Sequence, residues 1–208
     1  MFRKQLLDTT RGRIVSLLQR GGLTAHDIAA SLELTPTAIR AQLTAMERDG
    51  LVQRAGRRSG ATRPANVFEL TPEVEQLLSR AYIPFLTELV GVFSAGLPSG
   101  QLDDLMRAAG RSLAAGMSRP TGNLEARVAA ASALLNEQLG ALTRVEKNGR
   151  FVIKGVSCPL AALTGKHPGV CLAIESLVAE IVGASVKECC NRGSHPACCF
   201  EIGNRRRR

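Results

Sequence analysis

Residues 23–40 constrain the fold more than any other part of this 208-residue chain. Ile28 and Leu32 are four residues apart, which predicts a short helix with one apolar face. Thr35 is a typical N-cap for a second helix, and Pro36 stands at its first position, where the missing N–H costs nothing. Two short helices that meet at so tight a break indicate a helix-turn-helix.

The second helix of this motif has two contrasting faces. Its apolar face repeats at spacings of four and three, through Ile39, Leu43 and Met46. Its other face is small, polar and basic, which suits the major groove of DNA. We expect the DNA contacts of this helix to come from Thr35, Thr37, Arg40 and Thr44.

The flanking residues predict a wing on this motif. Residues 11–20 read as an amphipathic support helix, and residues 51–54 and 67–70 read as strands that flank a Gly/Arg/Ser loop over 55–66. Basic side chains at a wing tip reach the minor groove or the phosphate backbone, and the candidates are Arg57, Arg58 and Arg63. The alternative is a small three-helix module with a solvated basic loop. The full set of parts favours a winged helix-turn-helix DNA-binding domain over 1–80.

The charge distribution agrees with a nucleic-acid partner. The formal net charge is +9, and the basic excess lies in residues 1–80 and in the tail 204–208, which ends in four arginines. No apolar run approaches the roughly 18 residues of a membrane span, and no signal peptide is recognisable, so we expect a cytoplasmic protein without membrane contact. No catalytic constellation is visible, and we expect no enzyme.

The remaining sequence predicts two further parts and a mainly helical α+β fold class. Residues 81–140 are rich in Ala and Leu and read as a helical linker, for which we favour dimerisation on a two-fold DNA site over an internal helical layer. Residues 141–203 read as a small β-β-α-β-β module, whose first hairpin turns at Asn148–Gly149.

All six cysteines lie in this last module, between Cys158 and Cys199. Clustered cysteines in a reducing compartment are more often metal ligands or redox sensors than structural disulfides. Strand alternation turns Cys198 inward with Phe200, and favours Cys190 over its neighbour Cys189.

Two further cysteines complete a candidate ligand set. Cys171 falls on the apolar face of a helix near its N-terminus, where N–H groups are expected to stabilise a thiolate. Cys158 ends the second strand of the hairpin, before Pro159. We therefore expect one site made by Cys158, Cys171, Cys190 and Cys198.

Four converging thiolates suit an iron–sulfur cluster or Zn²⁺, and a thiol–disulfide switch or no ligand are the alternatives. Cys189 is an alternative ligand to its neighbour Cys190, and Cys199 is an alternative to Cys198, because these cysteines occur as two adjacent pairs. His167 and His195 lie in loops beside Cys171 and Cys198, and either one is a candidate replacement for a thiolate, although a solvated loop histidine is the simpler interpretation.

The chain resembles the SufR-type transcriptional regulators in both halves. The resemblance rests on residues 34–40 in the winged helix, residues 63–71 in the wing, Cys158–Pro159, residues 167–171 and residues 198–202. Cys158 and Cys171 match the first cysteine pair of that family at its C-x12-C spacing. The winged-helix part is shared with many DeoR-, ArsR- and MarR-like regulators.

This resemblance implies a specific function. It implies a dimeric bacterial repressor that binds an inverted-repeat operator and controls iron–sulfur assembly genes. It also implies that the C-terminal cysteines hold an iron–sulfur cluster, of the 4Fe–4S rather than the 2Fe–2S type. A zinc-stabilised or thiol-redox-sensing winged-helix regulator is the alternative.

Overall fold

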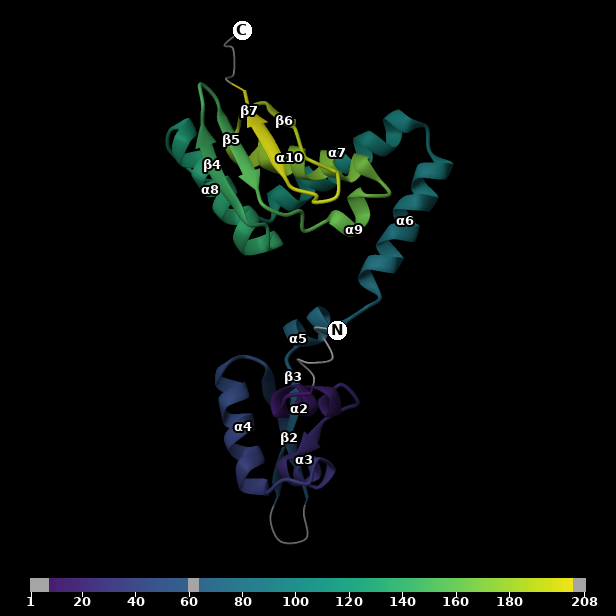
Figure 1. Ribbon diagram of the computed structural model, residues 1–208, viewed down its shortest axis with the longest axis vertical. Coiled ribbons are helices and arrows are strands. Elements are labelled where there is room, and N and C mark those ends of the chain that lie inside the picture. Colours follow the sequence, from purple (N-terminus) through teal and green to yellow (C-terminus); the bar gives the residue numbers. More distant parts are fainter. Residues whose placement is uncertain (1–7, 60–63, 204–208) are drawn as a thin grey trace. The chain divides into compact units, whose positions relative to one another are not determined.

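The structure is a computed structural model that describes residues 8–59 and 64–203. Its contacts divide the chain into two compact units, Met1–Arg80 and Ala81–Arg208, each with its own hydrophobic core. The two units are shown in Figure 1 and are described separately below. The predicted α+β fold class is confirmed.

The first unit is a winged helix-turn-helix. Its elements, in chain order, are α2 (Thr10–Leu18), β1 (Leu23–Thr24), α3 (Ala25–Leu32), α4 (Pro36–Arg48), β2 (Val52–Arg58), β3 (Ala65–Leu70) and α5 (Pro72–Leu78). The three strands form one antiparallel sheet in the order β1-β3-β2. Side chains from α2, α3, α4 and the sheet share one core.

The turn between α3 and α4 has the capping predicted from the sequence. The hydroxyl of Thr35 accepts a hydrogen bond from the backbone N–H of Ala38 at 3.2 Å, and Pro36 begins α4. Glu33 ends α3 with a φ of 56°, in the left-handed region. This single left-handed residue makes the break tight enough for α4 to leave in a new direction.

The wing differs from the prediction in the length of its strands. The loop predicted over residues 55–66 is wrong, because β2 continues to Arg58 and β3 begins at Ala65. A bulge between Arg54 and Gly56 lets the ladder continue, and Gly56 adopts a φ of 140° there. The predicted contact residue Arg63 lies outside the described residues.

The second unit packs helices on one face of a four-stranded sheet. Its elements are α6 (Tyr82–Gly96), α7 (Ser99–Ala115), α8 (Leu124–Leu139), β4 (Thr143–Lys147), β5 (Phe151–Gly155), α9 (Ala161–Thr164), a 3-10 turn η1 (Pro168–Val170), α10 (Cys171–Val182), β6 (Val186–Glu188) and β7 (Cys199–Ile202). The strand order is β4-β5-β7-β6, all antiparallel. Helices α8 and α10 contact the sheet, and α7 packs against α10 (Figure 1).

The core of this unit joins residues from the predicted helical linker and from the cysteine-rich module. Val128 of α8, Ile153 of β5, Leu177 of α10 and Phe200 of β7 are all almost fully buried in it. The third strand of the module was expected to run from Val186 to Cys190, but β6 stops at Glu188, so Cys190 follows the strand instead of ending it.

Helices α7 and α10 approach each other unusually closely at Gly110. A Cβ at this position would collide with the backbone carbonyl of Ala173 and would crowd the side chain of Ser176. Only glycine therefore permits this distance between the two helices.

Candidate DNA-binding surface and cysteine pocket

Helix α4 presents its polar face to solvent. Its three apolar residues, Ile39, Leu43 and Met46, are fully buried in the core of the first unit. The four residues predicted to contact DNA from this helix are all exposed: Thr35, Thr37, Arg40 and Thr44. Their exposure on one rigid helix is what major-groove reading requires, and the contacts themselves stay a prediction.

The wing arginines lie on a strand and have different partners. Arg58 pairs with the carboxylate of Asp27 at 3.1 Å and donates to the carbonyl of Gly22 at 3.2 Å, so it ties the wing to α3. Arg57 is exposed and forms no ion pair with another residue in the described part of the chain. Between the two, Arg57 is therefore the one whose charge is free for a phosphate.

The four cysteines predicted as ligands line a single cavity in the second unit. Its wall is otherwise mainly apolar, and the lining residues include Cys158, Cys171, Cys190 and Cys198, with Leu135, Pro159, Ile174 and Phe200. The cavity volume is about 20 Å³, which is little more than the space of one water molecule. The structure thus brings the four thiols together, while ligation by them stays a prediction.

Each thiol reaches this cavity from a different segment. Cys171 begins α10 directly after the 3-10 turn, and Cys158 lies between β5 and α9, with its sulfur 3.9 Å from the hydroxyl of Thr164. Cys190 follows β6 and Cys198 precedes β7, and a bridge between Asn191 and Ala197 closes the loop that separates them. Folding of the whole unit is therefore needed to assemble the site.

The remaining two cysteines form a disulfide, Cys189–Cys199, beside the cavity. Cys198 is buried with Phe200, whereas Cys199 points to the other side of the strand, as the alternation predicts. The backbone N–H of Cys199 donates to the sulfur of Cys190 at 3.2 Å. The disulfide thus fixes the strand pair that carries two of the four free thiols.

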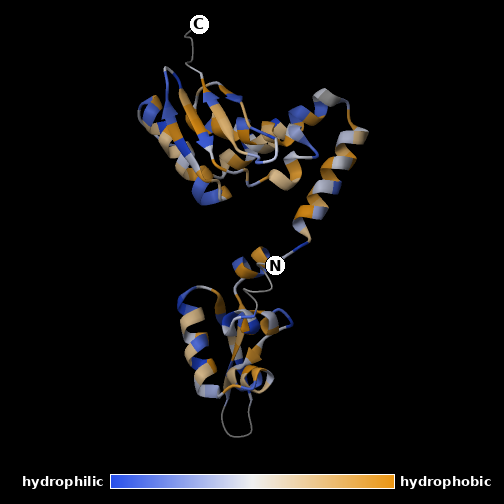
Figure 2. Ribbon diagram, viewed as in Figure 1, coloured by the Kyte–Doolittle hydropathy of each residue, from blue (hydrophilic) through white to orange (hydrophobic). Residues whose placement is uncertain are grey.

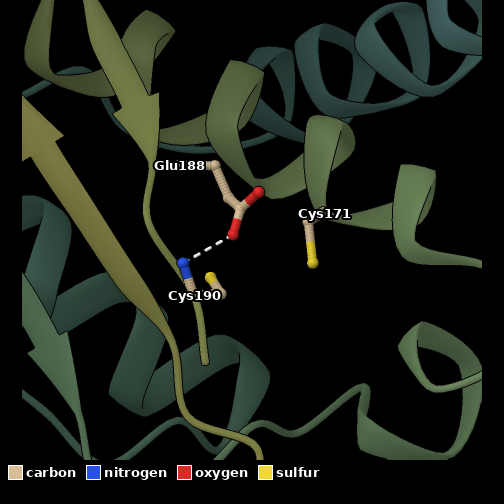
Figure 3. Close-up of side chains that lie close together, drawn as sticks. All are labelled: Cys171, Glu188 and Cys190. Carbon is tan, nitrogen blue, oxygen red and sulfur yellow. Dashed lines mark hydrogen bonds between the residues drawn. The ribbon is translucent and has the colours of Figure 1, made fainter. Parts of the chain in front are cut away.

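Two charged residues at this site were missed in the sequence. The carboxylate of Glu188 accepts a hydrogen bond from the backbone N–H of Cys190 and forms an ion pair with Arg192. Figure 3 shows the Glu188 carboxylate beside the sulfurs of Cys171 and Cys190. The spacing of Glu188 and Arg192 around the doubled cysteines is the only sequence signal for this pair.

The neighbouring groups keep two of the thiols protonated. The hydrogen bond with the Cys190 thiol, together with burial, raises the pKa of Cys171 far above its usual value. At Cys190 the hydrogen bond with Cys171 lowers the pKa, but a hydrogen bond with Cys198 and burial outweigh it and raise the pKa to about 12. The expected stabilisation of a Cys171 thiolate by the helix N-terminus is wrong here, because thiol neighbours and burial act in the opposite direction.

The Glu188 carboxyl group is held in its charged form. Burial raises its pKa, but hydrogen bonds from Cys190 and the ion pair with Arg192 outweigh burial and leave the pKa below its usual value. The pocket therefore contains two protonated thiols beside a carboxylate.

The two candidate loop histidines lie outside the cavity. His167 is half-buried and approaches Gly91 of α6, and it lines a separate groove of about 280 Å³ between α6, α7 and η1. His195 is exposed, with Nδ1 3.1 Å from the hydroxyl of Ser194. Neither histidine is among the residues that line the cysteine cavity.

Among the described residues, no single helix has the length and apolar character to cross a membrane. One bent pair, Pro72–Leu78 with Tyr82–Gly96, meets the criteria jointly, by length and composition alone.

Residues 8–54 match the family described as bacterial regulatory protein, arsR family. No curated protein matches the chain.

Three solved structures share a low overall similarity with it. Lactococcus lactis ZitR in apo form is 16% identical, with 49% of this chain and 77% of that chain covered and a TM-score of 0.30. MepR, a transcription regulator of the Staphylococcus aureus multidrug efflux pump MepA, is 23% identical, with 55% and 90% covered and a TM-score of 0.29. Bacillus subtilis PadR in complex with operator DNA is 13% identical, with 80% and 87% covered and a TM-score of 0.28.

At these TM-scores the three structures support no conclusion about the fold or function of this chain. The conclusion below rests on the family match alone. The matched segment spans α2, the helix-turn-helix and the start of the wing strand β2. Residues 8–54 are therefore similar to the DNA-binding segment of the ArsR-family regulators, and they lie in the unit that folds as a winged helix-turn-helix.

Proposed function

We propose that the chain is a DNA-binding transcription regulator, namely a cytoplasmic repressor that binds an inverted-repeat operator as a two-fold dimer and senses iron–sulfur or redox status. One observation carries the sensing part: four free thiols from four separate segments line one cavity, in the unit that does not contain the helix-turn-helix. A regulator with separate reading and sensing sites is the arrangement that allosteric control requires.

The residues present fit an iron–sulfur cluster in kind and number. Cys158, Cys171, Cys190 and Cys198 supply the four thiolates that such clusters take, and the apolar wall limits access of water. The cavity of about 20 Å³ has to widen to admit a cluster. When bound, a cluster supplies sensitivity to oxidation and to iron supply.

Ligation by these residues would add bonds between segments that packing, hydrogen bonds and the Cys189–Cys199 disulfide already hold together. Cys158 would tie the end of β5 to the start of α10, and Cys190 and Cys198 would tie both ends of the loop that leads into β7. Loss of the ligand frees all of these segments at once. A coupling of about 1–3 kcal/mol between two sites changes DNA affinity roughly 5–150-fold.

The direction of the response and the regulated genes rest on the resemblance to SufR-type regulators. It favours repression while the cluster is bound, and control of iron–sulfur assembly genes. The closed Cys189–Cys199 disulfide gives the thiol-redox alternative an observation of its own, because its reduction would loosen the strand pair beside the pocket.

The dimer interface is assigned to α6, at the start of the second unit. This helix carries one charged residue, Glu88, and apolar residues, orange in Figure 2, recur along its length. Most of them are exposed within one chain: Tyr82, Ile83, Phe85, Leu86, Val92 and Phe93. A helix that is apolar on most sides is normally buried, and a large exposed apolar patch marks an interface. A second copy of the same helix is the occupant that a two-fold DNA-binding dimer supplies.

Arg40 tests the DNA-binding assignment. Arg40→Ala is expected to lower operator affinity by about 1–3 kcal/mol and to relax preference at one base pair, because a base contact is lost. Arg57→Ala is instead expected to weaken binding to all DNA sequences alike. The slope of the logarithm of the binding constant against the logarithm of the salt concentration is expected to become less steep by about one unit. Arg111→Ala, which removes an exposed charge from α7, is the matched control. Titration of labelled operator at several salt concentrations measures all three, and unchanged binding by Arg40→Ala would refute the groove assignment.

A double substitution on α6 tests the dimer. Phe85 and Val92 lie seven residues apart on one face, and both are about two-thirds exposed in one chain, at 65% and 66%. Phe85→Lys with Val92→Lys is expected to yield monomers in sedimentation velocity, since four lysines would face each other across the two-fold axis. Leu142→Lys, at an equally exposed leucine (65%) before β4, is expected to stay dimeric. A monomeric wild-type chain, with and without DNA, contradicts the proposal.

A further inference from the structure

Three donor atoms beside the cysteine cavity lie close enough together to hold one metal ion. The sulfurs of Cys171 and Cys190 and a carboxylate oxygen of Glu188 are all within 4.8 Å of one another (Figure 3). They come from the start of α10, the end of β6 and the segment that follows β6. Cys158 and Cys198 line the cysteine cavity but are not among these three residues.

These separations suit one small ion. Ligands at about 2.0–2.3 Å from a tetrahedral zinc ion lie roughly 3–4 Å from each other, so small side-chain rotations would complete the site. Cys171 and Cys190 line the cavity of about 20 Å³, and a carboxylate oxygen of Glu188 lies within 4.8 Å of both sulfurs. Two soft sulfurs and one hard oxygen are a donor set that borderline divalent ions accept.

A cation already belongs to this set. The guanidinium of Arg192 forms an ion pair with the Glu188 carboxylate and also interacts with the sulfur of Cys171. Arg192 lies in the loop between Cys190 and Cys198, and its side chain is 38% exposed. Arg192 thus places a positive charge on one of the three donors, Glu188, from a partly exposed position in the loop.

We propose that Cys171, Glu188 and Cys190 bind one thiophilic divalent cation of the zinc type, and that Arg192 is the built-in counter-charge that the ion displaces. The ion shares Cys171 and Cys190 with the cluster of the proposed function, so ion and cluster are alternative occupants of one pocket. The regulatory meaning of the ion rests on that proposed function, whereas its binding does not.

The binding step balances in charge and protons. Both thiols lose a proton to solvent when their sulfurs coordinate the ion, so two protons are released per ion bound. The three ligands then carry three negative charges against two on the ion, and the displaced Arg192 side chain moves to solvent. Binding is therefore expected to weaken as the pH falls.

The site is also connected to the helices of the unit. The backbone N–H of Glu188 donates to the carboxylate of Glu175 on α10 at 2.8 Å, and Glu175 pairs with Arg107 of α7 at 2.7 Å. A change at Glu188 therefore reaches α7 through two charged groups.

Cobalt titration of the full-length reduced chain under anaerobic conditions tests the site. We expect one Co²⁺ per chain, thiolate-to-cobalt charge-transfer absorption, the visible bands of a tetrahedral ion and about two protons released per ion. Zn²⁺ is expected to displace the Co²⁺. Glu188→Gln is expected to weaken binding at least about tenfold, and Arg192→Gln to tighten it, because the competing charge is removed.

Two matched variants control for the other thiols. Cys158→Ser and Cys199→Ser are expected to bind Co²⁺ as the wild type does, while Cys171→Ser loses the charge-transfer band. Circular dichroism shows whether each variant is folded, and X-ray absorption of the zinc form counts the ligands, with two sulfurs expected. A count of four sulfurs, or equal loss in Cys158→Ser and Cys171→Ser, overturns the inference.

The proposed function and this inference fail in different ways. A chain that takes up a cluster and binds operator, but binds no Co²⁺, overturns the inference alone. A chain that binds one Co²⁺ through two sulfurs, but whose operator affinity is the same with and without any occupant of the pocket, overturns the sensing function alone.

Discussion

Cys171→Ser is expected to leave anaerobic reconstitution with iron and sulfide without a visible chromophore, whereas the wild type becomes coloured. Cys171 is buried at the start of α10 and lines the cavity, so its loss removes a thiolate that no neighbouring residue on α10 replaces. The same loss is expected for the other three free cysteines. Optical spectra and iron content of each variant measure the effect.

The disulfide cysteines are the internal controls of this series. Cys189→Ser and Cys199→Ser are expected to keep the chromophore, because neither residue lines the cavity. Loss in Cys199→Ser with retention in Cys198→Ser would contradict the strand-face assignment. Full cluster content in Cys158→Ser or Cys171→Ser would refute the four-cysteine site itself.

Leu177→Ala is expected to lower the free energy of unfolding of the second unit by about 2–5 kcal/mol. Leu177 is 0% exposed at the centre of the core that α8, α10 and the sheet share, so truncation leaves a cavity. Leu142→Ala removes the same atoms from a side chain that is 65% exposed, and a change within about 0.5 kcal/mol is expected there.

Chemical denaturation, followed by one spectroscopic probe in each unit, measures this effect. The two units have separate cores, so the transition of the helix-turn-helix unit is expected to stay at its wild-type midpoint in Leu177→Ala. An equal shift in both units would mean that they unfold as one cooperative body, and an equal loss in Leu142→Ala would mean that burial does not explain the cost.

Local sequence signals predicted the first unit well. The i, i+4 spacing, the Thr35 cap and Pro36 fix the helix-turn-helix because each acts within one turn of chain. The wing was less predictable, because strand length depends on the pairing partner and on the bulge at Gly56. No local pattern reveals that a ladder continues through a Gly/Arg loop.

The pocket was predictable only in part for a similar reason. Strand alternation correctly turned Cys198 inward, because a two-residue period is local. The Glu188–Arg192 pair and the disulfide partners depend on which segments the fold brings together. The protonated state of Cys171 likewise comes from Cys190, nineteen positions later in the chain, and a helix-end argument that considers only neighbours in sequence misses it.

The close approach at Gly110 gives the second unit a mechanical property. Side chains that separate two helices normally absorb small displacements by changing rotamer, but none intervenes between α7 and α10 at this point. Backbone lies directly on backbone, and closely packed interiors transmit strain. Helices α7 and α10 are therefore expected to move together as one rigid body, and Cys171 lies at the start of α10. A displacement at that cysteine is therefore expected to reach α7 through α10.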